Sequence, residues 1–187
     1  MDWTPLIWIL IAAGVFVLGA AVYLTWLQLT GNLHVIIPGE MYRSGHLNWD
    51  RIVRYRRKHQ IASIVNLRGP APKRDWYRQE VAAAKDQGIE HFDFALSAKH
   101  DVTPERAAEL VELMKAAPKP ILLHCKAGAD RTSLAAALYL AGVKGMDEKQ
   151  ARRMISMRFG HVPTHWAGTV AIGRSWKAIN EKRDGNA

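Results

Sequence analysis

Residues 121–132 read ILLHCKAGADRT and join an apolar segment to a helical one through a short glycine-containing loop. Ile121–Leu123 predicts a buried strand, and Thr132–Ala141 (TSLAAALYLA) predicts a helix that begins directly after the loop. Backbone N–H groups in such a loop, together with the amino end of the following helix, bind oxyanions. Gly128 permits the tight turn that gathers these N–H groups. The stretch therefore predicts an anion-binding loop at the carboxyl end of a strand.

Cys125 begins this loop and Arg131 ends it. The planar guanidinium of Arg131 matches two oxygens of a tetrahedral anion such as phosphate. The positive surroundings favour the thiolate form of Cys125, and a thiolate beneath a phosphate can attack phosphorus in line. Thr132 is placed to hydrogen-bond the sulfur, and His124 to order the loop. We expect Cys125 and Arg131 to be catalytic. We expect the substrate to be bound by Lys126, Ala127, Gly128, Ala129 and Thr132.

The rest of the chain alternates between predicted strands and helices. Strands are expected at Val35–Ile37, Met41–Arg43, Ala62–Leu67, Ile89–Leu96 and Ile121–Leu123. Helices are expected at Trp49–His59, Asp75–Gln87, Pro104–Ala116, Thr132–Ala141, Asp147–Phe159 and Trp166–Lys182. This alternation predicts an α/β fold with a mostly parallel central sheet flanked by helices. Ligands of such sheets bind beyond the carboxyl ends of the strands, which is where the Cys125 loop falls.

An apolar run of 24 residues, Leu6–Leu29, contains no charged side chain. As a helix it rises about 36 Å, enough to cross a hydrocarbon core of about 30 Å. Trp3 and Trp8 lie near one end and Tyr23 and Trp26 near the other, as expected of aromatic rings at two membrane interfaces. A cleaved signal peptide has a basic start and a shorter apolar core. The run therefore predicts a single transmembrane helix.

The charge balance and the cysteine count limit which structural frameworks and binding partners are possible. The 187 residues include 26 Lys and Arg against 17 Asp and Glu, for a formal net charge of +9. A single cysteine excludes a disulfide framework within the chain and any multi-cysteine zinc site. We expect neither a metal nor a cofactor. The Trp49–His59 stretch is strongly basic but lacks aromatic–basic interleaving, so anionic lipid headgroups are favoured over nucleic acid as its partner.

The basic residues also predict an orientation in the membrane. None precedes the apolar run, and several follow it: Arg43, Arg51, Arg54, Arg56, Arg57 and Lys58. The positive-inside rule then places the N-terminus outside and the main domain in the cytoplasm. We divide the chain into a membrane anchor, residues 1–30, and a catalytic domain, residues 31–187.

The motif HCKAGADRT at 124–132 resembles the C-x5-R-[ST] loop of the protein-tyrosine-phosphatase superfamily, in particular its dual-specificity branch. GEMYRSG at 39–45 resembles the YRSG-type segment of the atypical dual-specificity phosphatases of bacteria, plants and fungi. IVNLRG at 64–69 is similar to the strand and loop that follow it there. The resemblance covers roughly residues 35–145. One position departs from the pattern, because Ser133 stands where the family usually has glycine.

The resemblance implies hydrolysis of phosphomonoesters through a cysteinyl-phosphate intermediate, without a metal ion. It also implies an aspartate that protonates the leaving oxygen. Asp101 lies in the predicted loop 97–102, and Asp130 lies inside the motif. We rank these two together as candidate acids, with Asp93, expected within a strand, below them.

Additional cations are predicted near the phosphate. Lys126 resembles the lysine in the HCKAG loops of phosphatases that act on phosphoinositides and phosphatidylglycerophosphate, which suits a substrate with more charge than one phosphotyrosine. Arg43 and Arg68 are further candidates for substrate binding. The implied substrate is a phosphoprotein or a membrane lipid or polyol phosphate. A catalytically weak, phosphate-binding membrane adaptor is the alternative.

Overall fold

A five-stranded sheet organises the computed structural model, which describes residues 3–165 and 169–185. Its strands are β1 (His34–Ile37), β2 (Met41–Ser44), β3 (Ser63–Asn66), β4 (Glu90–Asp93) and β5 (Ile121–His124). They lie in the order β1-β2-β5-β3-β4. β1 pairs antiparallel with β2, and the other neighbours are parallel. The predicted α/β fold with a mostly parallel sheet is confirmed.

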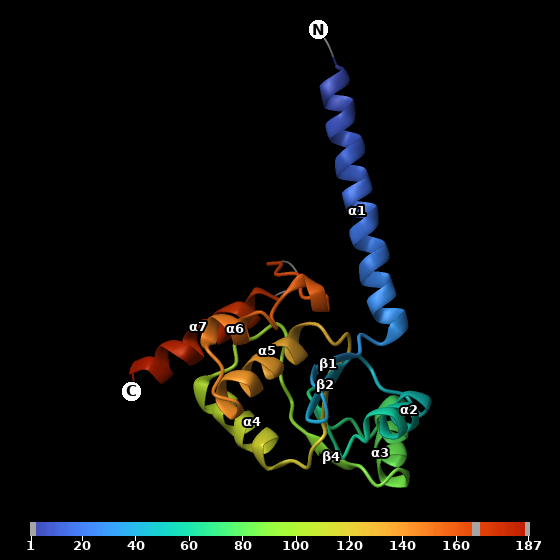
Figure 1. Cartoon of the computed structure of the whole chain (residues 1–187), viewed down its shortest axis with the longest axis vertical. Coiled ribbons are helices and arrows are strands. Elements are labelled where there is room, and N and C mark those ends of the chain that lie inside the picture. The colour runs from blue at the N-terminus through green and yellow to red at the C-terminus, as the bar shows by residue number, and fades with distance from the viewer. Residues whose placement is uncertain (1–2, 166–168, 186–187) are drawn as a thin grey trace.

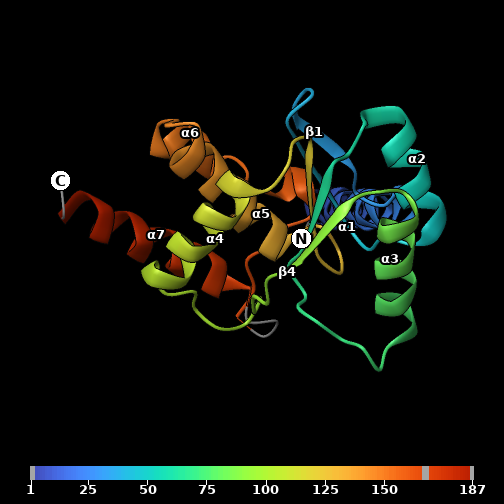
Figure 2. The same ribbon diagram turned by 90° about the horizontal axis from the view of Figure 1, so that it is seen from below.

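Helices cover both faces of this sheet (Figure 2). On one face lie α2 (Trp49–His59) and α3 (Asp75–Asp86); on the other lie α4 (Pro104–Ala116), α5 (Asp130–Leu138) and α7 (Val170–Gly185). Side chains of the central strand alternate between the two layers. Leu122 packs in the cluster with α2 and α3, whereas Ile121 and Leu123 pack in the larger cluster with α4 and α5. All four residues of β5 are buried, as expected for a strand covered on both faces.

Helix α1 (Thr4–Thr30) stands clear of this domain except at its base (Figure 1). It is long and apolar enough to cross a membrane, and its most apolar span is exposed. Leu27 is its buried residue. The helix ends at Gly31, whose φ of 79° is the left-handed conformation that glycine adopts without strain. Residues 31–33 then lead directly into β1.

Most predicted boundaries agree with the structure to within a few residues. The side chain of Thr103 accepts a hydrogen bond from the Arg106 N–H and caps α4, as predicted. The strand predicted at 89–96 is shorter in the structure, where β4 ends at Asp93. The helix predicted at Thr132–Ala141 begins at Asp130 as α5 and ends in a π-helical turn, Tyr139–Val143. Residues 166–168 of the last predicted helix lie outside the described residues.

The prediction of one continuous helix at 147–159 is wrong. Only α6 (Glu148–Arg152) is α-helical there, and a 3-10 turn, Met157–Phe159, follows after an extended Ser156. The Met154 carbonyl accepts a hydrogen bond from Arg43, and the Phe159 ring lies 4.1 Å below the same guanidinium. These tertiary contacts override the helical pattern of the segment.

Candidate active site

The loop that follows β5 turns its carbonyls outward. Four consecutive carbonyls accept hydrogen bonds from groups outside the loop: Lys126 from the His46 N–H at 3.0 Å, Ala127 from Asn32 at 3.0 Å, and Gly128 and Ala129 from Arg43 at 2.8 and 3.3 Å. Because the C=O and N–H of a peptide unit point in opposite directions, the loop N–H groups face its interior. The Gly128 N–H donates to the Cys125 sulfur at 3.3 Å. The loop is thus a nest of donors around this sulfur.

Gly128 is required by space as well as by conformation. Its φ is 71°, and a Cβ there would lie 2.6 Å from the Gly45 nitrogen and 2.7 Å from the Ser44 carbonyl carbon. The carboxyl end of β2 therefore packs directly behind the loop. No side chain larger than hydrogen fits between them.

Two donors beside the nest have no hydrogen-bond partner among the described residues. The Arg131 Nε and the Thr132 hydroxyl are both buried and unpaired, and the Arg131 Nη1 makes only a 3.5 Å contact with the Leu67 carbonyl. Cys125 is 2 % exposed. Buried polar groups are nearly always paired, so unpaired donors around an N–H nest mark a place where an anion can bind. The structure thus brings Cys125, Arg131, Thr132 and the loop amides together.

The Arg43 side chain lies behind the loop and contacts its carbonyls, and its role in substrate binding stays a prediction. Its guanidinium is fully buried and donates to the carbonyls of Gly128, Ala129 and Met154 and to the Ser133 hydroxyl. Burial lowers the pKa of Arg43 to about 9, and the nearby Cys125 acts in the opposite direction, so Arg43 stays charged at neutral pH. The hydroxyl of Ser133, at the position that departs from the family pattern, serves as one of its acceptors.

Replacing Arg43 by Met should destabilise the protein by about 3 kcal/mol, because it leaves several buried acceptors without a donor. The measurement is the free energy of unfolding by denaturant in detergent micelles. Arg54→Met, at an exposed position on α2, is the matched control and should change little. Equal stability of the two variants would contradict the bracing role.

Arg68 lies close to the loop, and Lys126 belongs to it. The Arg68 guanidinium stacks 3.3 Å from the centre of the Trp76 ring, and its Nη1 lies 3.4 Å from the His46 Nδ1. Burial lowers the pKa of Arg68; nearby Arg131 acts in the same direction, and Glu80 and Cys125 oppose it. These interactions place Arg68 close to the thiol and to Arg131. The Lys126 side chain is exposed.

Each candidate acid already has a partner. Asp101 forms an exposed ion pair with Arg174 at 2.9 Å. Asp130 accepts a hydrogen bond from the His161 Nδ1 at 2.7 Å. Asp93 accepts from Asn66 at 2.8 Å and from the Tyr77 hydroxyl. A carboxylate in any of these pairs must exchange its partner for the leaving oxygen before it can act as an acid.

The family of the chain follows from a match to a known sequence profile. The sequence profile described as "Tyrosine phosphatase family" matches residues 28–152, well over half of the chain. The chain belongs to the tyrosine phosphatase family. It is therefore a phosphatase, a phosphoric monoester hydrolase, as the motif at 124–132 predicted. A search of curated proteins found no match.

Solved structures of other phosphatases share the fold. TpbA from P. aeruginosa in complex with pTyr superposes with a TM-score of 0.63 at 22 % identity, over 81 % of this chain and 86 % of that one. PTPMT1 in complex with PI(5)P gives 0.59 at 15 % identity, over 81 % and 98 %. The core catalytic domain of the PP-IP phosphatase SIW14 from S. cerevisiae gives 0.58 at 19 % identity, over 82 % and 93 %. At these identities the likeness shows the fold alone.

Glu80 is a buried carboxylate behind the phosphatase loop that was not predicted from the sequence. Glu80 on α3 is fully buried, and its Oε1 lies 2.9 Å from the Nε2 of both His124 and His91. It anchors the residue immediately before Cys125. Its helical position is the available signal, since Ala83 and Ala84, three and four residues later on the same face, are fully buried. A glutamate on an apolar helix face indicates a buried partner.

Glu80 should make the stability of the folded phosphatase decrease at acidic pH. Burial opposes its charged form, but His124 and His91 outweigh burial and lower the pKa of Glu80 to about 2. The unfolded chain has a pKa near 4.5, so the stabilisation is complete above that pH and is lost as pH falls towards 2. The loss is at most about 3 kcal/mol.

The test follows the free energy of unfolding across that pH window. We expect a steeper decline for the wild type than for Glu80→Gln, which has no carboxylate to protonate. Glu90→Gln, at an exposed strand position, should keep the wild-type slope. Parallel profiles for Glu80→Gln and the wild type would contradict the assignment.

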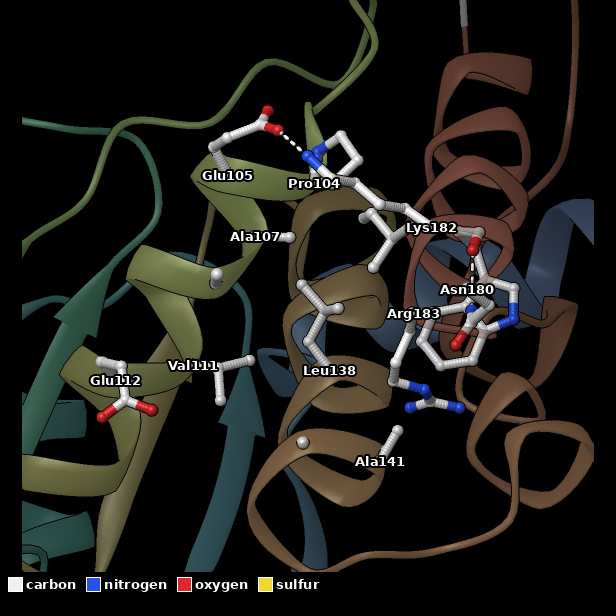
Figure 3. Close-up of a pocket in the computed structure, with 14 residues that line it drawn as sticks. Pro104, Glu105, Ala107, Val111, Glu112, Leu138, Ala141, Asn180, Lys182 and Arg183 are labelled. Carbon is white, nitrogen blue, oxygen red and sulfur yellow. Dashed lines mark hydrogen bonds and ion pairs between the residues drawn. The ribbon is translucent and has the colours of Figure 1, made fainter. Parts of the chain in front are cut away.

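A groove of about 410 Å³ lies between α4 and α7, away from the phosphatase loop (Figure 3). Val111, Leu138 and Ala141 give it an apolar lining, and an ion pair between Lys182 and Glu105 crosses one end. No residue of 124–132 lines it. It is therefore separate from the loop at residues 124–132.

Proposed function

We propose that this phosphatase is anchored in a membrane by residues 1–30 and hydrolyses phosphomonoesters with residues 31–187 through a cysteinyl-phosphate intermediate. The observation that carries the proposal is the nest of inward N–H groups around Cys125, with the unpaired donors of Arg131 and Thr132 beside it. Such a nest holds the equatorial oxygens of a phosphoryl group as their charge develops.

The proposed reaction has two steps. The Cys125 thiolate forms a bond to phosphorus as the bond to the leaving oxygen breaks, and an aspartic acid, Asp101 or Asp130, protonates that oxygen. Water then attacks phosphorus, the sulfur–phosphorus bond breaks, and inorganic phosphate leaves. Arg131 and the amides of Lys126–Ala129 stabilise the transferring group in both steps. Separate Asp101→Asn and Asp130→Asn variants decide between the two acids.

The substrate is proposed to be a phosphoprotein or a membrane lipid or polyol phosphate. Lys126, exposed at the loop, and Arg68, held against Trp76, add positive charge beside Arg131, which favours a substrate with several negative charges. Both substrate classes have precedent among the structural neighbours, since TpbA is described with pTyr and PTPMT1 with PI(5)P. We place the catalytic domain on the cytoplasmic side, following the distribution of basic residues.

Phosphate release from a substrate panel tests this function. Full-length protein is assayed in detergent micelles on phosphopeptides, lipid phosphates and inositol phosphates, with and without a metal chelator. We expect turnover that the chelator leaves unchanged. Phosphate binding without turnover of any substrate would replace the enzyme by the membrane adaptor. Preference within the panel separates the two substrate classes.

A further inference from the structure

The end of α1 is hydrogen-bonded to the catalytic loop. Gln28 and Asn32 both donate side-chain amide hydrogens to the Ala127 carbonyl, at 3.4 and 3.0 Å. The Gly31 carbonyl accepts from the Gly45 N–H at 2.8 Å, and Gly45 itself packs against Ala127. The helix end and the residues that follow it therefore supply part of the wall that orients the loop peptides. The helix does more than tether the domain.

A second set of contacts fixes the helix to the 3-10 turn Met157–Phe159. The Tyr23 hydroxyl donates to the Arg158 carbonyl at 2.7 Å, and the Asn32 amide donates to the Phe159 carbonyl at 2.9 Å. Residues 31–33 alone join α1 to β1, too few for a flexible linker. Helix, turn and loop are thus held together as one unit.

The length of α1 sets the depth of this unit. Its first 20 residues, Thr4–Tyr23, rise about 30 Å, the thickness of a hydrocarbon core. Tyr23 and Trp26 stack with ring centres 6.2 Å apart, and such rings prefer the membrane interface. The helix rises only about 10 Å more from Tyr23 to Thr30. If α1 spans a bilayer, as proposed above, the loop contacts at its end lie at the depth of the lipid headgroups.

The surface next to the helix end combines apolar and basic side chains. Leu29 on α1 is 76 % exposed, and Met157 on the 3-10 turn is 54 % exposed. Arg158 and Lys126 are exposed beside them, the latter on the loop itself. Apolar side chains that enter the headgroup boundary, accompanied by cations, are the chemistry that binds an anionic lipid surface.

We propose that α1 seats the catalytic loop on the surface of the bilayer that it spans, with Met157, Arg158 and Lys126 in the headgroup layer. The partner of this surface is a lipid bilayer containing anionic headgroups. The inference rests on the proposed function, because it specifies which phosphomonoesters the site reaches. These are the ones displayed at the surface of the same membrane.

Fluorescence quenching by labelled lipids measures the depth without any need for activity. Cys125→Ser removes the single cysteine of the chain, so Met157→Cys in that background gives one site for a fluorophore. Lys115→Cys is the matched control: it is exposed near the end of α4, which leads into the amino end of β5, whereas the loop follows the carboxyl end of β5. Both labelled proteins are placed in nanodiscs of phosphatidylcholine and phosphatidylglycerol whose headgroups carry a nitroxide quencher. We expect several-fold stronger quenching at residue 157 than at residue 115. Equal quenching at the two sites would overturn the proposal.

A second measurement tests the consequence for substrate access. Wild-type protein in vesicles is offered phosphatidic acid either in the same vesicles or in separate ones, with a water-soluble aryl phosphate as reference. We expect several-fold faster lipid turnover in the same vesicles. Equal rates, including no lipid turnover in either arrangement while the aryl phosphate is hydrolysed, would overturn same-membrane action. Loss of all turnover with the expected quenching pattern would refute the proposed function and support the surface placement.

Discussion

Cys125→Ser is expected to lower phosphatase turnover on the order of 10⁴-fold or more, the largest effect of any single substitution in this chain. A hydroxyl in place of the thiol is a far weaker nucleophile near neutral pH, and no other cysteine is available to replace it. The nest remains, because its carbonyls are held by Arg43, Asn32 and His46 and not by the thiol. The variant should therefore still bind inorganic phosphate.

Rapid acid quenching with a radiolabelled substrate measures the intermediate directly. The wild type should retain label on Cys125 during turnover, and Cys125→Ser should retain none. Unchanged circular dichroism of the variant controls for folding. Turnover that survives the substitution would rule out the covalent mechanism.

Arg131→Lys should lower kcat/KM by about 10²–10³-fold, although the positive charge is kept. A guanidinium presents parallel N–H groups to two phosphate oxygens at once, whereas an ammonium is a single point charge on a flexible stem. The buried Arg131 Nε has no hydrogen-bond partner within the part of the chain that the structure describes, so the fold does not use this donor. Stability should change much less than catalysis.

Steady-state kinetics and denaturant unfolding on the same preparations separate these effects. Arg152→Lys, on the exposed side of α6, is the matched control and should match the wild type in both measurements. A proportionate loss of stability and activity in Arg131→Lys would assign Arg131 a structural role.

The sequence carried enough information for the sheet and the loop, and the reasons are local. Strand, glycine, arginine and helix follow one another within residues 121–141, so their spatial relation is fixed by a few backbone angles. Pro104 and Thr103 fixed the start of α4 in the same way. The family profile confirmed the resemblance to tyrosine phosphatases that the loop motif predicted. The roles assigned to the individual site residues stay predictions.

The features that the sequence did not reveal are contacts between residues distant in sequence. Arg43 is close to the loop, as expected, but spacing along the chain does not reveal on which side of the loop a side chain lies. Glu80 was overlooked because its two histidine partners are 11 and 44 positions away. The segment 153–159 has a helical pattern, yet Arg43 draws the Met154 carbonyl and the Phe159 ring towards itself. The spacing of apolar residues along a segment does not reveal contacts of this kind with a distant side chain.

The shared acceptor at Ala127 has a practical consequence for biochemistry on a water-soluble fragment. A fragment that begins after α1 would lose the Gln28 donor, and its residues 31 and 32 would become a frayed end. The Ala127 peptide would then be free to rotate, and the neighbouring amides would be less preorganised for the transition state. Rates measured on such a fragment would understate those of the full-length protein.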